Sequence, residues 1–137
     1  MSGINELIRT ESDGTISFGN YELAAKSKKS DFEFGGDIYK VKTFNEITKL
    51  ERNGMLVYES VPGTAVTHFQ VKEDGVAFFV EGTKDAQVTL ELEEDTVYTV
   101  YIDDADSGKV KTNLGGKLAL SVELENAEQV AVKIVKG

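Results

Sequence analysis

The sequence predicts a mainly β protein, an antiparallel β-sandwich whose β-rich amino-terminal half carries one or two short helices. Three observations lead to this prediction. Apolar and polar residues alternate in most segments, which is the period of a strand with one buried face. Turn signals separate the segments of the carboxyl-terminal half about every eight to twelve residues. The chain has 137 residues, of which 40% are hydrophobic, enough for the core of one domain.

The first segments predict one helix and one hairpin. Residues 4–8 place three apolar side chains on one helical face and predict a short first helix. Residues 16–18 and 21–25 both alternate, and Gly19-Asn20 lies between them. Two turn residues between two such runs predict a β-hairpin.

A second helix is predicted over residues 44–52, between a strand at 38–42 and a strand at 55–61. Thr43 and Glu46 stand at the spacing of a capping box, and Asn53-Gly54 supplies a left-handed stop. Three apolar residues recur every three positions, which favours an amphipathic helix packed on the sheet. They are Phe44, Ile47 and Leu50.

The remainder of the chain predicts strand after strand. We expect residues 1–137 to form a single compact unit, with a possible subdivision into 1–60 and 64–137 around the only proline, Pro62. The second part is expected to be a sandwich of immunoglobulin-like character. Its seven predicted strands cover residues 66–72, 76–80, 88–92, 97–102, 109–112, 118–124 and 130–134.

The charge of the chain argues against nucleic acid as a partner. It has 24 acidic and 15 basic residues, a net charge of −9, and only two arginines, whereas nucleic-acid binding depends on Lys and Arg at phosphates. Residues 51–100 alone carry ten acids and three bases. A solvated acidic face explains this excess, and a cation site or a basic protein partner is the alternative.

The sequence also predicts no membrane partner and a cytoplasmic location. No window approaches the roughly 18 apolar residues of a membrane span. The first ten residues lack the basic and apolar regions of a secretory signal.

The chain lacks most of the residue types on which common catalytic sites depend. It has no cysteine and one histidine, so thiol nucleophiles, Cys-ligated metals and His clusters are excluded, and no cofactor is predicted. His68 shares a predicted strand face with Gln70 and Lys72, which favours a surface histidine over the base of a catalytic triad. No Gly-x-Ser-x-Gly motif is present. We therefore assign no catalytic residue, and an enzyme is not the expected class.

One acidic turn is the candidate metal site. Asp103, Asp104 and Asp106 are the residues that would bind a divalent cation, because calcium prefers carboxylate oxygens. The ligand series of an EF-hand does not continue, since its fifth and twelfth positions fall on Gly108 and Gly115. An acidic hairpin turn is therefore the favoured interpretation.

Three stretches resemble a family of small bacterial proteins of unassigned function, whose members often carry the label endosialidase. The stretches are residues 36–51, 57–66 and 111–118, and the likeness extends over nearly the whole chain. Sialidases typically hold the sialate carboxylate with three arginines and use a tyrosine nucleophile. The resemblance implies membership of this family. Because this chain has only two arginines, we do not expect sialidase activity. At fold level, the carboxyl-terminal half also resembles accessory β-sandwiches found beside bacterial carbohydrate-active enzymes.

These observations predict a non-catalytic binding or assembly module that acts through a sheet face or a strand edge, as a homo-oligomer or with another protein. Small β-rich chains must protect or use their edges. The alternative is a glycan-binding module or a carboxylate-based glycosidase, which would need exposed tyrosines beside Asp or Glu. The five tyrosines are Tyr21, Tyr39, Tyr58, Tyr98 and Tyr101.

Overall fold

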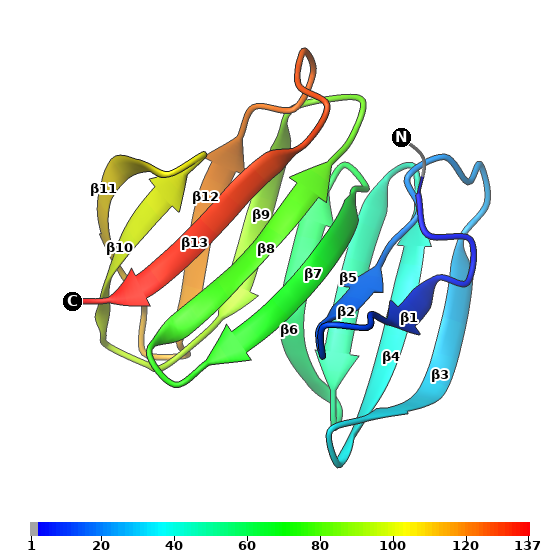
Figure 1. The fold of residues 1–137 in the computed structure, drawn as a ribbon, viewed down its shortest axis with the longest axis horizontal. Coiled ribbons are helices and arrows are strands. Elements are labelled where there is room, and N and C mark those ends of the chain that lie inside the picture. The colour runs from blue at the N-terminus through cyan, green and yellow to red at the C-terminus, as the bar shows by residue number, and fades with distance from the viewer. Residues whose placement is uncertain (1–2) are drawn as a thin grey trace.

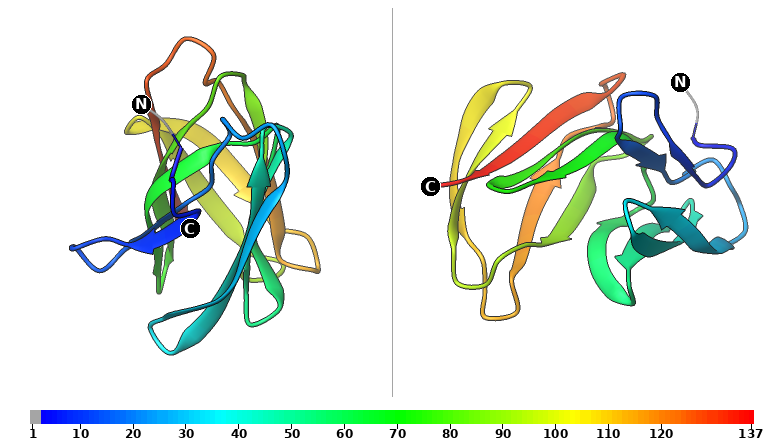
Figure 2. Two further views of the ribbon diagram at one scale, coloured as in Figure 1. Left: turned by 90° about the vertical axis from the view of Figure 1, so that its right-hand side faces the viewer. Right: turned by 60° about the horizontal axis from the view of Figure 1, so that its bottom comes forward.

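The computed structural model describes residues 3–137 and shows an all-β protein (Figure 1). Its 13 strands form two antiparallel sheets, one of seven and one of six strands. The sheets lie face to face as two layers (Figure 2). The predicted mainly β, sandwich-like arrangement is therefore confirmed, whereas both predicted helices are wrong.

Strands that are distant in sequence are neighbours in each sheet. In spatial order, the seven-stranded sheet contains β1 (Ile8–Thr10), β2 (Ile16–Phe18), β7 (Ala65–Lys72), β8 (Gly75–Glu81), β13 (Val130–Lys136), β10 (Val97–Ile102) and β11 (Ala105–Lys111). The six-stranded sheet contains β12 (Lys117–Val122), β9 (Ala86–Glu91), β6 (Met55–Val61), β5 (Ile47–Arg52), β4 (Asp37–Phe44) and β3 (Ser27–Phe34).

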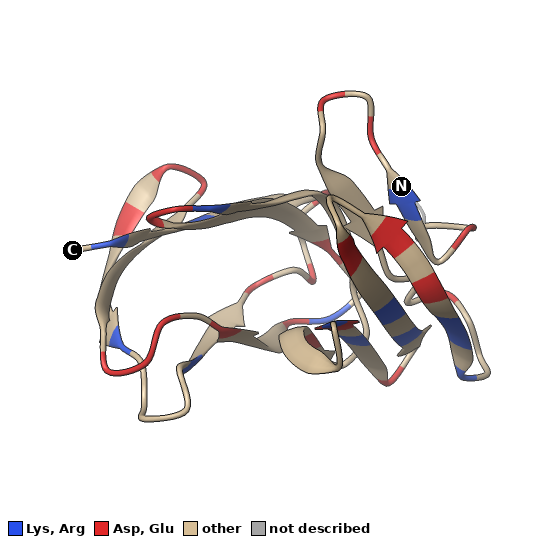
Figure 3. Ribbon diagram, turned by 90° about the horizontal axis from the view of Figure 1, so that it is seen from below, with Lys and Arg blue, Asp and Glu red and all other residues tan. Residues whose placement is uncertain are grey.

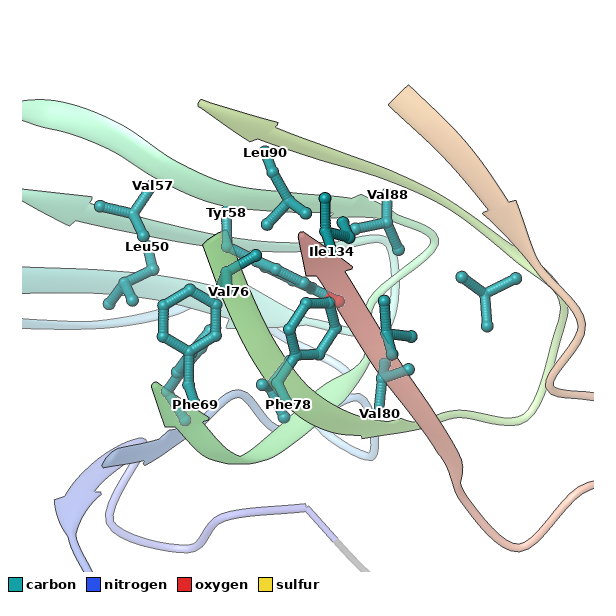
Figure 4. Close-up of a cluster of buried hydrophobic side chains, with 14 of the residues drawn as sticks. Leu50, Val57, Tyr58, Phe69, Val76, Phe78, Val80, Val88, Leu90 and Ile134 are labelled. Carbon is teal, nitrogen blue, oxygen red and sulfur yellow. The ribbon is translucent and has the colours of Figure 1, made fainter. Parts of the chain in front are cut away.

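A cluster of aromatic rings joins the two layers. Tyr58 of β6 is fully buried, and its ring meets Phe18 at 5.3 Å and Phe78 at 5.7 Å between centroids, both edge to face. Phe69 lies 5.5 Å from both phenylalanines. Figure 4 shows Tyr58 pointing from one sheet toward Phe69 and Phe78 of the other. Edge-to-face pairs of this kind stabilise a core beyond the area that they bury.

Five buried side chains with hydroxyl groups are hydrogen-bonded to one another, and we call them the hydroxyl network: Thr43, Thr48, Tyr58, Ser60 and Thr64. The Thr64 hydroxyl lies 2.8 Å from both the Tyr58 and the Ser60 hydroxyl. Thr48 donates to the Thr64 carbonyl at 2.8 Å and accepts its amide at 3.0 Å, and it is 2.8 Å from Thr43. Every hydroxyl in the network therefore has a partner, as buried polar groups require.

The predicted helix at 44–52 is instead a hairpin of β4 and β5. Phe44 pairs with Ile47 across a two-residue turn. Thr48 and Leu50 face the core while Lys49 is partly exposed, so the true period is two. The alternation was missed because Thr48, a polar residue, occupies a core position. Its hydroxyl is hydrogen-bonded within the hydroxyl network.

The first predicted helix and the first predicted hairpin are also wrong. Residues 8–10 form the short strand β1, after a turn in which Leu7 has a positive φ of 71°. Residues 16–18 form a strand as expected, but residues 21–25 do not. Strand β2 pairs with β1 and β7 rather than with the segment that follows it.

All seven strands predicted beyond Pro62 are present, as β7 to β13. Each sheet combines strands from before and after Pro62, because β2 pairs with β7 and β6 with β9. The hydrophobic core likewise includes residues from both sides. The strand pairing therefore does not follow the subdivision at this proline. Residues 3–137 include no helix of the length and apolarity needed to cross a membrane.

Candidate functional site

The two open sheets leave four edge strands, and three of them carry features that discourage pairing with another chain. Strand β1 is three residues long, and its Arg9 is held by Glu11 at 3.0 Å. Strand β3 has lysines at 28 and 29 and an irregular register. Strand β11 is also irregular in register and carries exposed charges. Short length, bulges and charges are the usual protection of a sheet edge.

Strand β12 differs from the other three edges. Its six residues pair with β9 in an unbroken register, and Lys117 at its start is its only charged residue. The sequence between Lys117 and Glu123 is Leu-Ala-Leu-Ser-Val. An edge of this length with a regular register and an uncharged centre can accept another strand through its free backbone groups.

The alternation of β12 decides which groups face outward. The Leu92 amide donates to the Gly116 carbonyl at 2.7 Å, so the even-numbered residues of β12 direct their backbone groups to β9. Ala119 and Ser121 therefore direct their amides and carbonyls to the free edge. Leu120 is only partly buried against the core, which leaves apolar surface along the same edge.

The turn before β12 adds a second apolar feature at this end of the molecule. Leu114 is 80% exposed, more than any other large hydrophobic side chain that the structure describes. It lies between β11 and β12, in the loop closed by the Gly116 amide donating to the Asn113 carbonyl at 3.0 Å. A single exposed hydrophobic residue is common on protein surfaces, so Leu114 supports an interaction surface only together with the open edge of β12.

His68 occupies a second notable surface, on the outer face of the seven-stranded sheet. Its Nδ1 lies 2.8 Å from Asp13 Oδ2 and 3.2 Å from the Thr15 hydroxyl. Thr15 in turn donates to Asp13 Oδ1 at 2.5 Å. The hydrogen bond from the Thr15 side chain, more than any other contact, lowers the pKa of Asp13. The sequence interpretation of a surface histidine agrees with its side-chain exposure of 45%, but it missed the bond to Asp13, which lies 55 residues away.

The backbone of His68 has a positive φ of 53°, inside a register irregularity between β7 and β8. The side chain lines a shallow depression of about 470 Å³, which includes Ala77, Phe79, Tyr101 and Lys133. Within residues 3–137, the only hydroxyl hydrogen-bonded to the ring is that of Thr15, which shares Nδ1 with the aspartate. A serine nucleophile on the other ring nitrogen is thus missing from the described part of the chain, and the arrangement does not form a catalytic triad.

The predicted cation site does not gather its three aspartates. Asp103 and Asp104 both have positive φ at the β10–β11 turn. Asp103 accepts the Ala131 amide at 2.9 Å, and Asp106 accepts the Gly108 amide at 2.8 Å. In the described chain, no group of three or more His, Cys, Asp or Glu side chains is placed to hold a metal ion. These contacts agree with a structural role in the turn, and cation binding here stays a prediction.

The tyrosines needed by the glycan alternative lie mainly inside the protein. Tyr39, Tyr58 and Tyr98 are buried. Tyr21 donates to Glu81 Oε2 at 3.0 Å, and Tyr101 is the only one that lines the depression around His68. Stacking of a sugar between two exposed tyrosines therefore has no counterpart on this surface.

Comparisons with protein-family models, with curated proteins and with solved structures find no match to this chain. The family resemblance noted in the sequence therefore stays a prediction.

Proposed function

We propose that this protein is a non-catalytic assembly module, which forms a symmetric homodimer by pairing β12 with β12 of a second copy. The two six-stranded sheets would then join into one continuous antiparallel sheet. The observation that carries the proposal is the contrast among the four edges, because β12 alone combines full strand length, regular register and an uncharged centre.

The sequence of β12 is self-complementary in one antiparallel register. With Leu120 on the two-fold axis, Ala119 lies opposite Ser121 of the second copy, and these are the residues whose backbone groups face outward. The same register places Lys117 opposite the exposed Glu123, so each end of the paired strands gains an opposite-charge pair. The two half-buried Leu120 side chains would cover each other. A two-fold interface requires this kind of self-complementarity.

The small size of the contact favours a weak dimer. Pairing of two six-residue edges buries less than the roughly 1,200–2,000 Å² of a standard stable interface. We therefore expect a dimer in reversible exchange with monomer at micromolar concentrations, and Leu114 at the same end would add apolar area.

Sedimentation velocity across a concentration series tests the proposal. We expect Ala119→Pro to shift the protein to monomer, since proline removes an outward amide that the β9 ladder does not use. Ala119→Val is the matched control, because it keeps the amide and suits a strand. Wild type that stays monomeric at several hundred micromolar, or an Ala119→Pro variant that dimerises normally, would refute the proposal.

Charge reversal provides a test of the register itself. Lys117→Glu and Glu123→Lys should each weaken the dimer, because each places like charges opposite one another. The double variant restores both pairs with reversed polarity and should recover dimerisation. If the double variant is weaker than either single variant, the register is wrong even where β12 is the interface.

The glycan alternative has less support, because Tyr101 lines the depression around His68 without a second tyrosine, and Tyr39, which lines another depression, is itself buried. Within that depression, Phe79 and Tyr101 could stack on a sugar ring. A glycan array with wild type and Tyr101→Ala would test it, and binding that depends on Tyr101 would favour this alternative over pure assembly. The immunoglobulin-like character of residues 64–137 and the cytoplasmic location stay predictions.

A further inference from the structure

A row of lysines crosses the outer face of the six-stranded sheet at the end opposite β12. Lys28 of β3 is the register partner of Lys42 of β4, and Lys42 is the partner of Lys49 of β5. Lys40 is two residues from Lys42 on the same face of β4. We call these four side chains the lysine face. Figure 3 shows blue bands on adjacent strands at this end of the molecule.

The lysine face is unusual for this chain. Together with the adjacent Glu51 it carries a net charge of +3, whereas the chain as a whole carries −9, so all other residues together carry −12. In the described part of the chain, the one ion pair on the face is between Lys49 Nζ and Glu51 Oε2, at 3.6 Å, and Glu51 is also the register partner of Lys40. Glu59, the partner of Lys49 on β6, ends the row. Like charges directly opposite one another destabilise a sheet. Repulsion between Lys42 and its two lysine partners therefore lowers the stability of the protein when no ligand is bound.

The four lysines also enclose a space. A shallow depression of about 100 Å³ is lined by the four lysines of the face and by Glu51. Adjacent strands are about 4.8 Å apart, so three lysines in a row span about 10 Å. A compact ligand can therefore contact all of them at once, and each ammonium group offers three donors to anionic oxygens.

We propose that the lysine face binds a compact, soluble anion that carries two or more phosphate groups. Such a ligand relieves the repulsion between the lysines and fits the width of the row. A long polyanion such as nucleic acid, or an anionic membrane, extends beyond the face and meets the acidic remainder of the surface within about one Debye length of 8 Å. The small polyphosphate is thus the ligand class that the charge distribution favours. This proposal is independent of dimerisation, because β3 and β12 are opposite edges of the sheet.

Calorimetric titration of the full chain with tripolyphosphate at low salt tests the proposal. We expect saturable binding, with orthophosphate at least tenfold weaker because it contacts fewer lysines. Lys42→Gln removes the central lysine and should weaken tripolyphosphate binding about tenfold or more, as loss of a charge-assisted contact does. Lys133→Gln is the matched control, because Lys133 lines the depression on the other sheet and its loss changes the net charge equally.

Thermal unfolding separates loss of the ligand site from loss of the fold. Without ligand, Lys42→Gln should unfold at the same or a higher temperature than wild type, because it removes like-charge repulsion. Tripolyphosphate should raise the melting temperature of wild type and Lys133→Gln more than that of Lys42→Gln.

Three results would overturn the proposal: no saturable binding of tripolyphosphate, equal weakening by Lys42→Gln and Lys133→Gln, or tighter binding of a single-stranded oligonucleotide or of anionic vesicles than of tripolyphosphate. The last result would assign the face to a macromolecular polyanion or to a membrane surface.

Discussion

The hydroxyl network makes a sharp prediction about Thr64. Substitution of Thr64 by valine keeps the shape of the side chain and removes one oxygen from the centre of the core. Both the Tyr58 and the Ser60 hydroxyl hydrogen-bond to that oxygen at 2.8 Å. The bonds between Thr48 and Thr64 involve the Thr64 backbone, so the substitution leaves them in place.

The expected loss of stability follows from the Tyr58 and Ser60 hydroxyls, which lose their hydrogen bonds to Thr64. Burial raises the pKa of Tyr58 to about 12, so its hydroxyl remains protonated and needs an acceptor at any ordinary pH. A buried polar group without a partner costs about 1–3 kcal/mol. In Thr64→Val both the Tyr58 and the Ser60 hydroxyl lose their hydrogen bond to Thr64, and we expect the free energy of unfolding to fall by about 1–3 kcal/mol.

Urea unfolding measures this change directly. With a slope of about 2 kcal/mol per molar urea for a domain of this size, the midpoint should fall by about 0.5–1.5 M. Thr89→Val is the matched control, because Thr89 lies on the outer face of β9 in register with Glu59 and Ala119, and it should change stability by no more than about 0.5 kcal/mol.

A double-mutant cycle tests the reasoning more strictly. If the Tyr58 and Thr64 hydroxyls stabilise each other, the cost of Thr64→Val should be smaller in a Tyr58→Phe background, with a coupling of at least about 0.5 kcal/mol. Equal effects of Thr64→Val and Thr89→Val, or strict additivity in the cycle, would show that the network adds nothing to stability.

Two further predictions concern single residues. Glu81 is 3% exposed, and its Oε1 has no hydrogen-bond partner in the described chain. Burial raises its pKa above 4.5. The stability that this group contributes is therefore present below pH 4.5 and is lost as the pH rises through the folded-state pKa. Equilibrium unfolding at several pH values should show Glu81→Gln gaining on wild type above pH 4.5, and parallel pH profiles would contradict this. His68 has a φ of 53°, so His68→Gly should be more stable than His68→Ala by about 1 kcal/mol, because glycine adopts this conformation without steric cost. Both variants lose the Asp13 contact, so the difference between their urea midpoints reports the backbone alone, and an alanine variant as stable as the glycine variant would refute the argument.

The sequence was most informative where polar and apolar residues alternated strictly. The seven strands beyond Pro62 could be predicted because their inward positions are apolar, as in Val88 and Leu90 of β9. The hairpin at 44–52 could not, because Thr48 is a polar residue at a core position, where it bonds Thr43 across the hairpin and Thr64 in the loop between β6 and β7. Asn53-Gly54, interpreted as a helix stop, is instead a hairpin turn with both φ values positive.

The candidate surfaces were less accessible to sequence reasoning than the strands. Nothing local distinguishes β12 from its neighbours, because an edge is defined by the absence of a partner on one side. The lysine face depends on the register between β3, β4 and β5. The sequence predicted β4 only over residues 38–42 and predicted a helix in place of β5, so this register could not be anticipated. A signal for it was present, since Lys28, Lys40, Lys42 and Lys49 are four basic residues within a short part of an acidic chain.

The position of β13 has a consequence for biosynthesis. This strand separates β8 from β10, although it follows both in the chain. Its register with β8 joins residues 50 or more positions apart, such as Val80 and Val130. A nascent chain that has emerged only as far as β12 therefore exposes two unpaired strand borders in the middle of its larger sheet. Because pairings of such long sequence separation form slowly, we expect the polypeptide to be prone to aggregation until β13 has paired with both neighbours.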